Sequence, residues 1–227
     1  MAARSRPEAL PRGLAVHAWA LDLHADAASD WDILAEAERM RARQYQRAAD
    51  RRRYVQTRAG LRRLLAQRMS CRPAEVPIVA GLHGKPEVAR PAAPRFNVAH
   101  AGSRALVALA DARRISHVGV DIEACMPGLD AVAMMPLALT EAEQEELVRT
   151  RDLEAAMYAR WVEKEAVLKA IGVGVSVHLR TVSIHPDSDG GLRVRSTRPA
   201  WAGFKVMAID APPGYAAALA WHSEDEI

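Results

Sequence analysis

The sequence has only two cysteines among its 227 residues, no long apolar run and no phosphate-binding glycine loop. Cys71 and Cys125 lack the spacing of metal ligands, and one possible pair does not make a disulfide framework. We expect both to be buried free thiols of a cytoplasmic protein. No apolar stretch reaches the length of a transmembrane helix, and the N-terminal stretch MAARSRPEALPRG lacks the apolar core of an export signal. The stretch GVGV is not followed by the Lys-Ser/Thr pair of a P-loop.

Acidic residues are nearly missing from residues 39–72, which contain twelve arginines and a single acid, Asp50. The net charge of the whole chain is only +3, so the basic charge is concentrated in this segment. Such a density predicts an anionic partner: the phosphates of a nucleotide, a nucleic acid or an acidic protein. The alternative is a solvated pair of basic helices. Aromatic residues, on which single-stranded bases stack, are limited here to Tyr45 and Tyr54, which weakens the nucleic-acid interpretation.

The hydrophobic pattern predicts helices and strands in two successive groups. Residues 31–69 predict two helices, broken near Ala49–Asp50, with Asp50 as the N-cap of the second. Residues 73–89 are interrupted by Pro and Gly, which indicates a loop with at most short strands. Further elements are predicted as strands at 95–100, 104–110 and 117–123, a helical region at 140–171 that opens with a Thr140–Glu143 capping box, and strands at 181–186, 192–196, 201–210 and 214–222.

This order of elements predicts an α+β protein made of two pseudo-symmetric halves, each a small antiparallel sheet with packed helices. We expect the first half to comprise residues 1–113 and the second residues 114–227, with the active site at their junction. No change of composition marks the boundary, so it rests on the pattern of elements alone.

Two carboxylates occupy one face of the strand predicted at HVGVDIE. Side chains alternate along a strand, so Val118, Val120 and Ile122 point one way while Asp121 and Glu123 point the other. Like charges this close repel each other, and a hard divalent cation such as Mg²⁺ would reverse the repulsion. The alternative is a wet strand end, because a D-x-E pattern alone is a weak signal.

A third carboxylate interrupts an apolar helix face in RWVEKEAVLKAIG. Met157, Trp161 and Leu168 recur at helical spacing, and Glu165 lies between them on the same side. Lys169 follows one turn later. A carboxylate in a core position is costly unless a metal ion or a paired charge compensates it. Glu165 therefore completes a candidate metal site with Asp121 and Glu123.

Four spaced motifs together resemble those of the 4'-phosphopantetheinyl transferases. These motifs are GKPEV at Gly84–Val88, FNVAHAG at Phe96–Gly102, GVDIE, and WVEKEAVLKAIGVG some forty residues later. The closing WAGFKVMAIDAPPGYAAALAW is also similar, so the likeness covers nearly the whole chain. It is to the monomeric, two-half type that activates peptide and polyketide synthases. The resemblance implies transfer of the phosphopantetheine arm of coenzyme A to a serine of an acyl or peptidyl carrier protein, with Mg²⁺ as cofactor and adenosine 3',5'-bisphosphate as product.

The resemblance also assigns roles to residues. It implies that Asp121, Glu123 and Glu165 bind the metal, that Lys169 contacts the phosphate, and that Glu165 takes the serine proton. Asp121, Glu165 and Lys169 are thus the expected catalytic residues. The residues expected to bind the coenzyme A nucleotide, besides Lys169, are Gly84, Lys85, Pro86, His100, Arg41 and Arg53.

One position departs from the family pattern. The serine that usually precedes the motif histidine is Ala99 here, so a hydroxyl donor to phosphate is missing. Ser103 is a candidate substitute.

The carrier protein is expected to be acidic. Met126, Met134 and Met135 form either its docking patch or part of the core. Two other functions stay open: a nucleic-acid-binding protein with a nuclease-like metal site, and a non-catalytic module that binds coenzyme A or a carrier protein. The favoured interpretation expects no nucleic acid or membrane partner, and a monomer.

Overall fold

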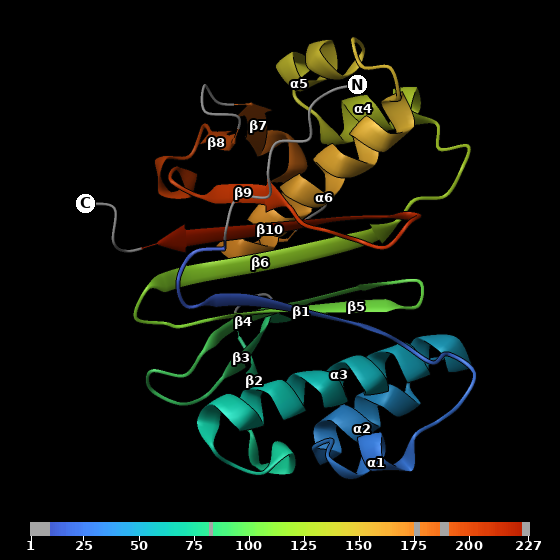
Figure 1. Ribbon diagram of the computed structural model, residues 1–227, viewed down its shortest axis with the longest axis vertical. Helices are drawn as coiled ribbons and strands as arrows, with labels where there is room; N and C mark the ends of the chain where they lie inside the picture. The colour runs from blue at the N-terminus through green and yellow to red at the C-terminus, as the bar shows by residue number, and fades with distance from the viewer. Residues whose placement is uncertain (1–9, 82–83, 175–177, 187–190, 224–227) are drawn as a thin grey trace.

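A computed structural model describes residues 10–81, 84–174, 178–186 and 191–223, and it confirms the predicted α+β class with antiparallel sheets. Figure 1 shows two sheets stacked in the middle of the molecule with helices on both outer sides. The first sheet has the order β1 (Leu14–Ala20), β5 (Arg104–Ala110), β4 (Arg95–Ala101). The second has the order β6 (Ile115–Ala124), β10 (Tyr215–Ser223), β9 (Lys205–Ala208), β8 (Leu192–Ser196), β7 (Val182–Pro186).

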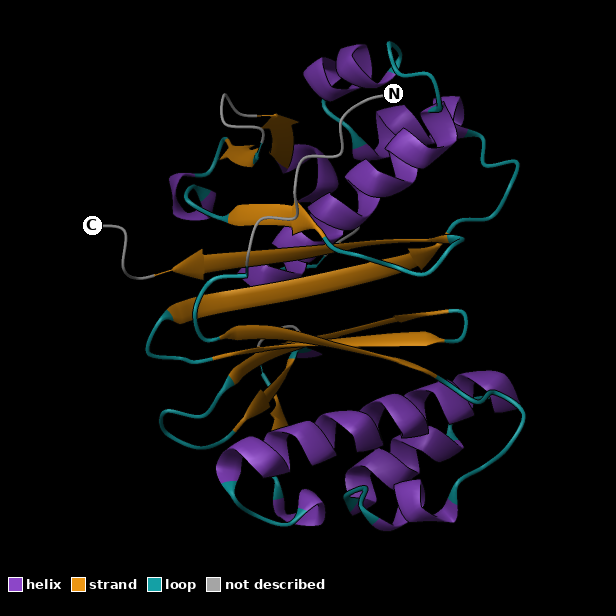
Figure 2. Cartoon of the chain, in the orientation of Figure 1, coloured by secondary structure: helices purple, strands orange, loops and turns teal. Residues whose placement is uncertain are grey.

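Helices cover the outer face of each sheet, as the coloured cartoon in Figure 2 makes clear. On the outer side of the first sheet lie α1 (Ala28–Asp32), α2 (Glu36–Arg43) and α3 (Ala48–Met69). On the outer side of the second lie α6 (Leu153–Ile171) and, beyond it, α4 (Ala131–Ala138) and α5 (Glu141–Leu147). Strands β2 (Ile78–Ala80) and β3 (Pro86–Val88) form a separate two-stranded ribbon.

The two sheets share a core between their facing sides. Leu106 and Ala108 on β5 belong to one buried cluster with Val120 and Ile122 on β6 and Leu219 on β10. Alternation along each strand sends every second side chain into this layer. The turn between β5 and β6 covers residues 111–114, so the first sheet uses only strands before it and the second only strands after it. The division into two units at this point stays a prediction.

Several local predictions are wrong. Strand β1 was not predicted, because LAVHAWA is rich in weak strand formers and is defined by its long-range pairing with β5. The helix break lies before Ala48, where Arg47 is the N-cap, so Asp50 sits in the first turn of α3 and pairs with Arg53 at 2.6 Å. The third predicted strand corresponds to β6, which is part of the second sheet. The Thr140–Glu143 capping box is confirmed.

Many of the clustered arginines hold the helices together. Arg62 is 1% exposed, and it donates to Glu38 at 2.6 Å and to the carbonyl oxygen of Pro73 at 2.8 Å. Arg63 pairs with Asp30 at 2.7 Å. Acids outside the arginine-rich segment therefore neutralise part of it, and less of its charge faces solvent than the sequence suggests.

The sulfur-containing residues also differ from expectation. Cys71 and Cys125 are free but half-buried rather than buried. Met135 is 5% exposed and belongs to the core, Met134 packs half-buried against the same cluster, and Met126 is 67% exposed. The three methionines therefore do not form one exposed patch. Among the described helices, none has the length and apolarity that crossing a membrane would require.

Candidate active site

Strand β6 and helix α6 meet at Gly119, where their backbones come very close. A side chain at this position would place a Cβ 2.0 Å from the carbonyl oxygen of Ala166 and 2.4 Å from the amide nitrogen of Ala170. A glycine inside a strand commonly marks such an approach. The contact brings the face of β6 that carries Asp121 and Glu123 against the face of α6 that carries Glu165.

The three carboxylates predicted to bind metal converge at this junction. Asp121, Glu123 and Glu165 each offer an oxygen, and these oxygens all lie within 4.8 Å of one another. Asp121 is 2% exposed, whereas Glu123 and Glu165 are half-buried. The Oδ2 atom of Asp121 is buried and has no hydrogen-bond partner among the described residues. A buried carboxylate oxygen without a partner is costly, and a hard cation among these oxygens would satisfy it. The residues therefore fit a divalent ion.

Lys169 is the cation of the site. Its Nζ lies 2.5 Å from Oδ1 of Asp121, and its side chain is 25% exposed. One ammonium thus faces three carboxylates, which leaves the cluster short of positive charge. The structure brings together the four residues that the sequence analysis grouped, and their roles stay a prediction.

Burial and neighbouring charges shift the pKa values of the three carboxyl groups. Burial raises the pKa of Asp121, although Lys169 opposes the effect. Burial, and then the charge of Asp121, raise the pKa of Glu123. Burial raises the pKa of Glu165 to about 7, and the charges of Asp121 and Glu123 add to the effect. Mutual repulsion in a partly dry cleft is typical of a functional site.

Trp161 is a site residue that sequence reasoning missed. Its hydrogen bond to the Glu165 side chain opposes the rise in that group's pKa. In the sequence, Trp161 fits the apolar stripe of the helix. It also lies four residues, or one helical turn, before Glu165, and this spacing indicates that the two side chains are neighbours.

A cavity of about 300 Å³ adjoins the cluster and contains most of the predicted nucleotide-binding residues. The predicted residues that line it are Arg41, Gly84, Pro86, His100 and Lys169. Its wall also includes Tyr45, Tyr54, Thr57 and Arg58, which sequence reasoning did not assign. The guanidinium groups of Arg41 and Arg58 lie 5.6 and 5.7 Å from the centre of the Tyr54 ring. A cationic and aromatic wall beside an acidic cluster suits a base and phosphates.

Two predicted nucleotide-binding residues lie elsewhere. Arg53 does not line the cavity: its Nε donates to the carbonyl oxygen of Gly102 at 2.8 Å. The ammonium of Lys85 also points away from the cavity and contacts backbone carbonyls of the second half, including that of Lys169 at 2.6 Å. Ser103, the candidate substitute for the missing hydroxyl, is not part of the cavity wall either.

Position 99 is part of the cavity wall. Ala99 is 4% exposed and lies next to His100, and it also belongs to the buried cluster between the two sheets. The pocket wall removes water from the His100 imidazole and lowers its pKa, and Arg53 and Lys169 lower it further. A second, larger cavity of about 670 Å³ lies behind Pro86, between the β3–β4 segment and the end of α6.

Comparison with known proteins supports the motifs. The family model of the 4'-phosphopantetheinyl transferase superfamily matches residues 117–220. A putative 4'-phosphopantetheinyl transferase of Synechocystis sp. is 33% identical over 154 residues, which cover 66% of this chain and 61% of that protein. A phosphopantetheinyl transferase of Thraustochytrium sp. is 29% identical over 235 residues, covering 93% and 81%. The 4'-phosphopantetheinyl transferase of Bacillus subtilis is 30% identical over 124 residues, covering 54% and 53%.

Solved structures give a weaker likeness. The holo-[acyl-carrier-protein] synthase of Thermotoga maritima matches with a TM-score of 0.40 and 22% identity, over 47% of this chain and 62% of that one. The enzyme of Bacillus anthracis in complex with CoA (3',5'-ADP) matches with a TM-score of 0.40 and 21% identity, over 48% and 97%. The family-model match covers the acidic cluster and Lys169, and the relatives it agrees with extend over most of the chain. Residues 117–220 of the chain belong to the 4'-phosphopantetheinyl transferase superfamily.

Proposed function

We propose that the protein is a Mg²⁺-dependent 4'-phosphopantetheinyl transferase that modifies a serine of an acyl or peptidyl carrier protein. The observation that carries the proposal is the convergence of Asp121, Glu123 and Glu165 within 4.8 Å, with Lys169 against them and a basic cavity alongside. A module that only binds coenzyme A has no use for three carboxylates forced together at a cost.

The acidic cluster supplies the ligands for the ion. Asp121, Glu123 and Glu165 would hold Mg²⁺, which when bound neutralises the pyrophosphate of coenzyme A and aligns the attacked phosphorus. Lys169 lies between the cluster and the cavity, and in this position its ammonium stabilises charge that develops on the departing bisphosphate.

Glu165 has a second assignment, as acceptor of the serine proton. Without an ion, burial raises its pKa to about 7. A bound cation would lower that pKa and keep the carboxylate ionised near neutral pH, which is the form that accepts a proton. A positioned base contributes about 10²- to 10⁴-fold. Most of the acceleration in this proposal therefore comes from positioning and charge neutralisation.

The cavity of about 300 Å³ is assigned to the nucleotide end of coenzyme A. Arg41 and His100 supply phosphate contacts, while Gly84 and Pro86 border the base. Tyr54, with Arg41 and Arg58 stacked beside it, forms the wall against which the base packs. Arg53 acts on this site only indirectly, because its guanidinium is bound to the β4–β5 turn and to Asp50.

The rest of the functional proposal concerns the whole protein. The chain spans 61% of the length of its Synechocystis relative and 53% of that from Bacillus subtilis, so activity, partner and assembly are inferred from the site. We assign it to the monomeric two-half type, with units 1–113 and 114–227, acting in the cytoplasm on an acidic carrier protein.

Intact-mass spectrometry of carrier proteins tests the function directly. A panel of acyl and peptidyl carrier proteins is incubated with the protein, Mg²⁺ and coenzyme A. A mass increase equal to the phosphopantetheine arm is expected on at least one carrier, and none when the metal is chelated or when the carrier serine is changed to alanine. The exposed Glu145→Gln on α5 serves as a control variant that keeps full activity. Absence of modification across the panel would reject the proposal.

Calorimetry separates the nucleic-acid interpretation. Coenzyme A is expected to bind with Mg²⁺ at both low and moderate salt, whereas duplex DNA is not. Tight, strongly salt-dependent DNA binding without coenzyme A binding would favour a nuclease-like protein.

A further inference from the structure

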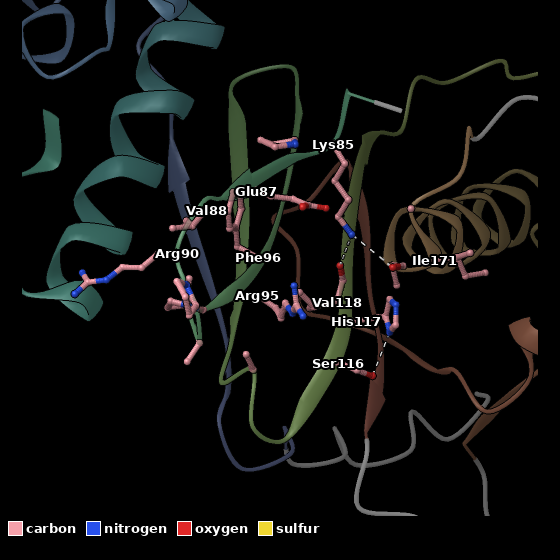
Figure 3. Close-up of a pocket in the computed structure, with 18 residues that line it drawn as sticks. Lys85, Glu87, Val88, Arg90, Arg95, Phe96, Ser116, His117, Val118 and Ile171 are labelled. Carbon is pink, nitrogen blue, oxygen red and sulfur yellow. Dashed lines mark hydrogen bonds between the residues drawn. The ribbon is translucent and has the colours of Figure 1, made fainter. Parts of the chain in front are cut away.

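Lys85 lies in the Gly84–Pro86 motif, yet its side chain leaves the nucleotide cavity that its two neighbours line. Figure 3 shows it extending between the β3 segment, β6 and the end of α6. Its Nζ lies 2.6 Å from the carbonyl oxygen of Lys169, 3.3 Å from that of Val118 and 3.5 Å from that of Ala170. All three acceptors are backbone atoms of the second half of the chain.

The end of α6 needs donors of this kind. The last carbonyls of a helix have no partner within the helix. At α6 the amides of Gly172 and Val173 both donate to the carbonyl of Leu168, at 2.9 and 3.2 Å. The next two carbonyls, those of Lys169 and Ala170, receive the Lys85 ammonium instead. A cation at a helix C-terminus is also favoured by the helix dipole.

The same ammonium contacts the outer edge of β6. This strand is the end strand of its sheet, so its outer backbone groups lack a strand partner. Asn97 of the first half accepts from the amide of Val120 at 2.9 Å, and Lys85 donates to the carbonyl of Val118 two residues earlier. Two side chains of the first half thus secure the strand that carries Asp121.

We propose that Lys85 is a positioning residue that holds α6 and β6 at the separation the metal site requires, rather than a ligand of the nucleotide. Its acceptors lie one helical turn after Glu165 on α6 and three residues before Asp121 on β6, so it joins the two elements whose spacing sets the acidic cluster. We call these contacts of Lys85 with α6 and β6 the clamp. The expected effect on transfer rests on the proposed function, whereas the clamp itself does not.

The surroundings of the amine agree with an enclosed position. Burial lowers the pKa of Lys85 to about 8, with Arg95 adding to the decrease and Glu87 opposing it. Lys85 lines the larger cavity of about 670 Å³, but its Nζ is within hydrogen-bond distance of the three backbone carbonyls.

Hydrogen exchange on the free protein tests the clamp. Lys85→Met keeps the aliphatic stem and removes the donors. We expect peptides covering the end of α6 and strand β6 to exchange about tenfold faster in this variant, because local opening becomes easier. Arg90→Met is the matched control: Arg90 is an exposed cation on the wall of the same larger cavity, and in Figure 3 its guanidinium points away from Lys85. It should exchange like the wild type. Unchanged exchange in Lys85→Met overturns the clamp, whatever the protein catalyses.

Binding and kinetics separate a clamp from a ligand. Lys85→Met should bind adenosine 3',5'-bisphosphate with wild-type affinity while kcat falls by about tenfold to 10²-fold, as expected for a misplaced site. Loss of a nucleotide contact would instead weaken that affinity by about tenfold or more, and this result overturns the proposal. If the wild type shows no transfer at all, the function fails and the exchange result still decides the clamp.

Chemical labelling of the wild type guards against a variant that does not fold. Lysine acetylation is followed by mass spectrometry with and without adenosine 3',5'-bisphosphate and Mg²⁺. The nucleotide should protect Lys169 and leave the slow labelling of Lys85 unchanged. Protection of Lys85 equal to that of Lys169 contradicts the proposal.

Discussion

Helix α6 presents two charged clusters on different faces, and they are built in opposite ways. On one face Glu143 and Lys164, both 0% exposed, pair at 2.5 Å. Glu143 also accepts from the amide of Thr140 and the amide of Ile184, each at 2.9 Å. On the other face Asp121 keeps a buried oxygen without a partner among the described residues, beside two further carboxylates.

Both clusters contain carboxylates and a lysine, and they differ in how many of the carboxylate oxygens receive hydrogen bonds. The Glu143 cluster satisfies both carboxylate oxygens and joins α5, α6 and β7, so it acts in folding. The Asp121 cluster has fewer donors than its oxygens require among the described residues, and a divalent ion would compensate for the missing donors. A raised pKa does not separate the two faces, because burial raises the pKa of both Glu163 and Glu165 to about 7. What differs is the neighbour: Arg160 lies 3.3 Å from Glu163, whereas Glu165 faces carboxylates.

Removal of Lys164 should give the largest effect on stability. Lys164→Met leaves Glu143 buried without its cation, and breaking a buried pair costs about 3–5 kcal/mol. Urea denaturation measures the loss, and Glu143→Gln in the same background should recover part of it. The folded fraction should retain its transfer rate. A loss of transfer without a loss of stability would mean that this face is catalytic after all.

Glu165→Gln should do the reverse. Transfer to a carrier protein should fall by about 10²-fold or more, the scale for losing a catalytic electrostatic group. The free energy of unfolding should not decrease, because the change relieves repulsion with Asp121 and Glu123. Near-normal transfer in this variant would remove Glu165 from the site.

The pH dependence of stability should distinguish the faces through the metal. Both Glu163 and Glu165 have a folded pKa raised to about 7 above an ordinary value of 4.5, so the stability they contribute is present at low pH and is lost as the pH rises through about 7. A bound cation lowers the pKa of its ligands. Saturating Mg²⁺ should therefore reduce the decline in melting temperature.

Two variants show which glutamate causes each part of the pH dependence of the melting temperature. Glu165→Gln should abolish the Mg²⁺-sensitive part, whereas Glu163→Gln should abolish only a part that Mg²⁺ does not affect. If Mg²⁺ changes the pH dependence of the melting temperature equally in both variants, the proposed difference between the two faces of α6 is wrong.

Ala99→Ser should give the smallest effect of these predictions. It concerns the cavity that adjoins the Asp121 cluster. Ala99 is nearly fully buried in the cluster between the two sheets and also lines the cavity, so a new hydroxyl that turns to the cavity adds one donor beside His100. One such hydrogen bond is worth about 0.5–1.5 kcal/mol, or at most about a tenfold tighter binding of adenosine 3',5'-bisphosphate. Titration calorimetry measures it, with Ser103→Ala as a control outside the cavity. A weaker affinity would show that the buried position cannot accept the extra atom.

The sequence predicted what depends on local pattern. Period-two alternation placed Asp121 and Glu123 on one face of β6, and helical spacing placed Glu165 and Lys169 on one face of α6. It did not predict what depends on distant pairing. Strand β1 forms because β5 is available to it, and Arg53 and Lys85 are directed by backbone carbonyls far along the chain. Charge density likewise could not reveal that Glu38 and Asp30 neutralise arginines of the neighbouring helix.

The site depends on Gly119, a residue that has no side chain. Gly119 sets the distance between β6 and α6, because a larger residue would push the helix away from the strand. Mutational surveys that target only acids and bases would overlook it, although a single added methyl there would widen the separation between Glu165 and the two carboxylates of β6.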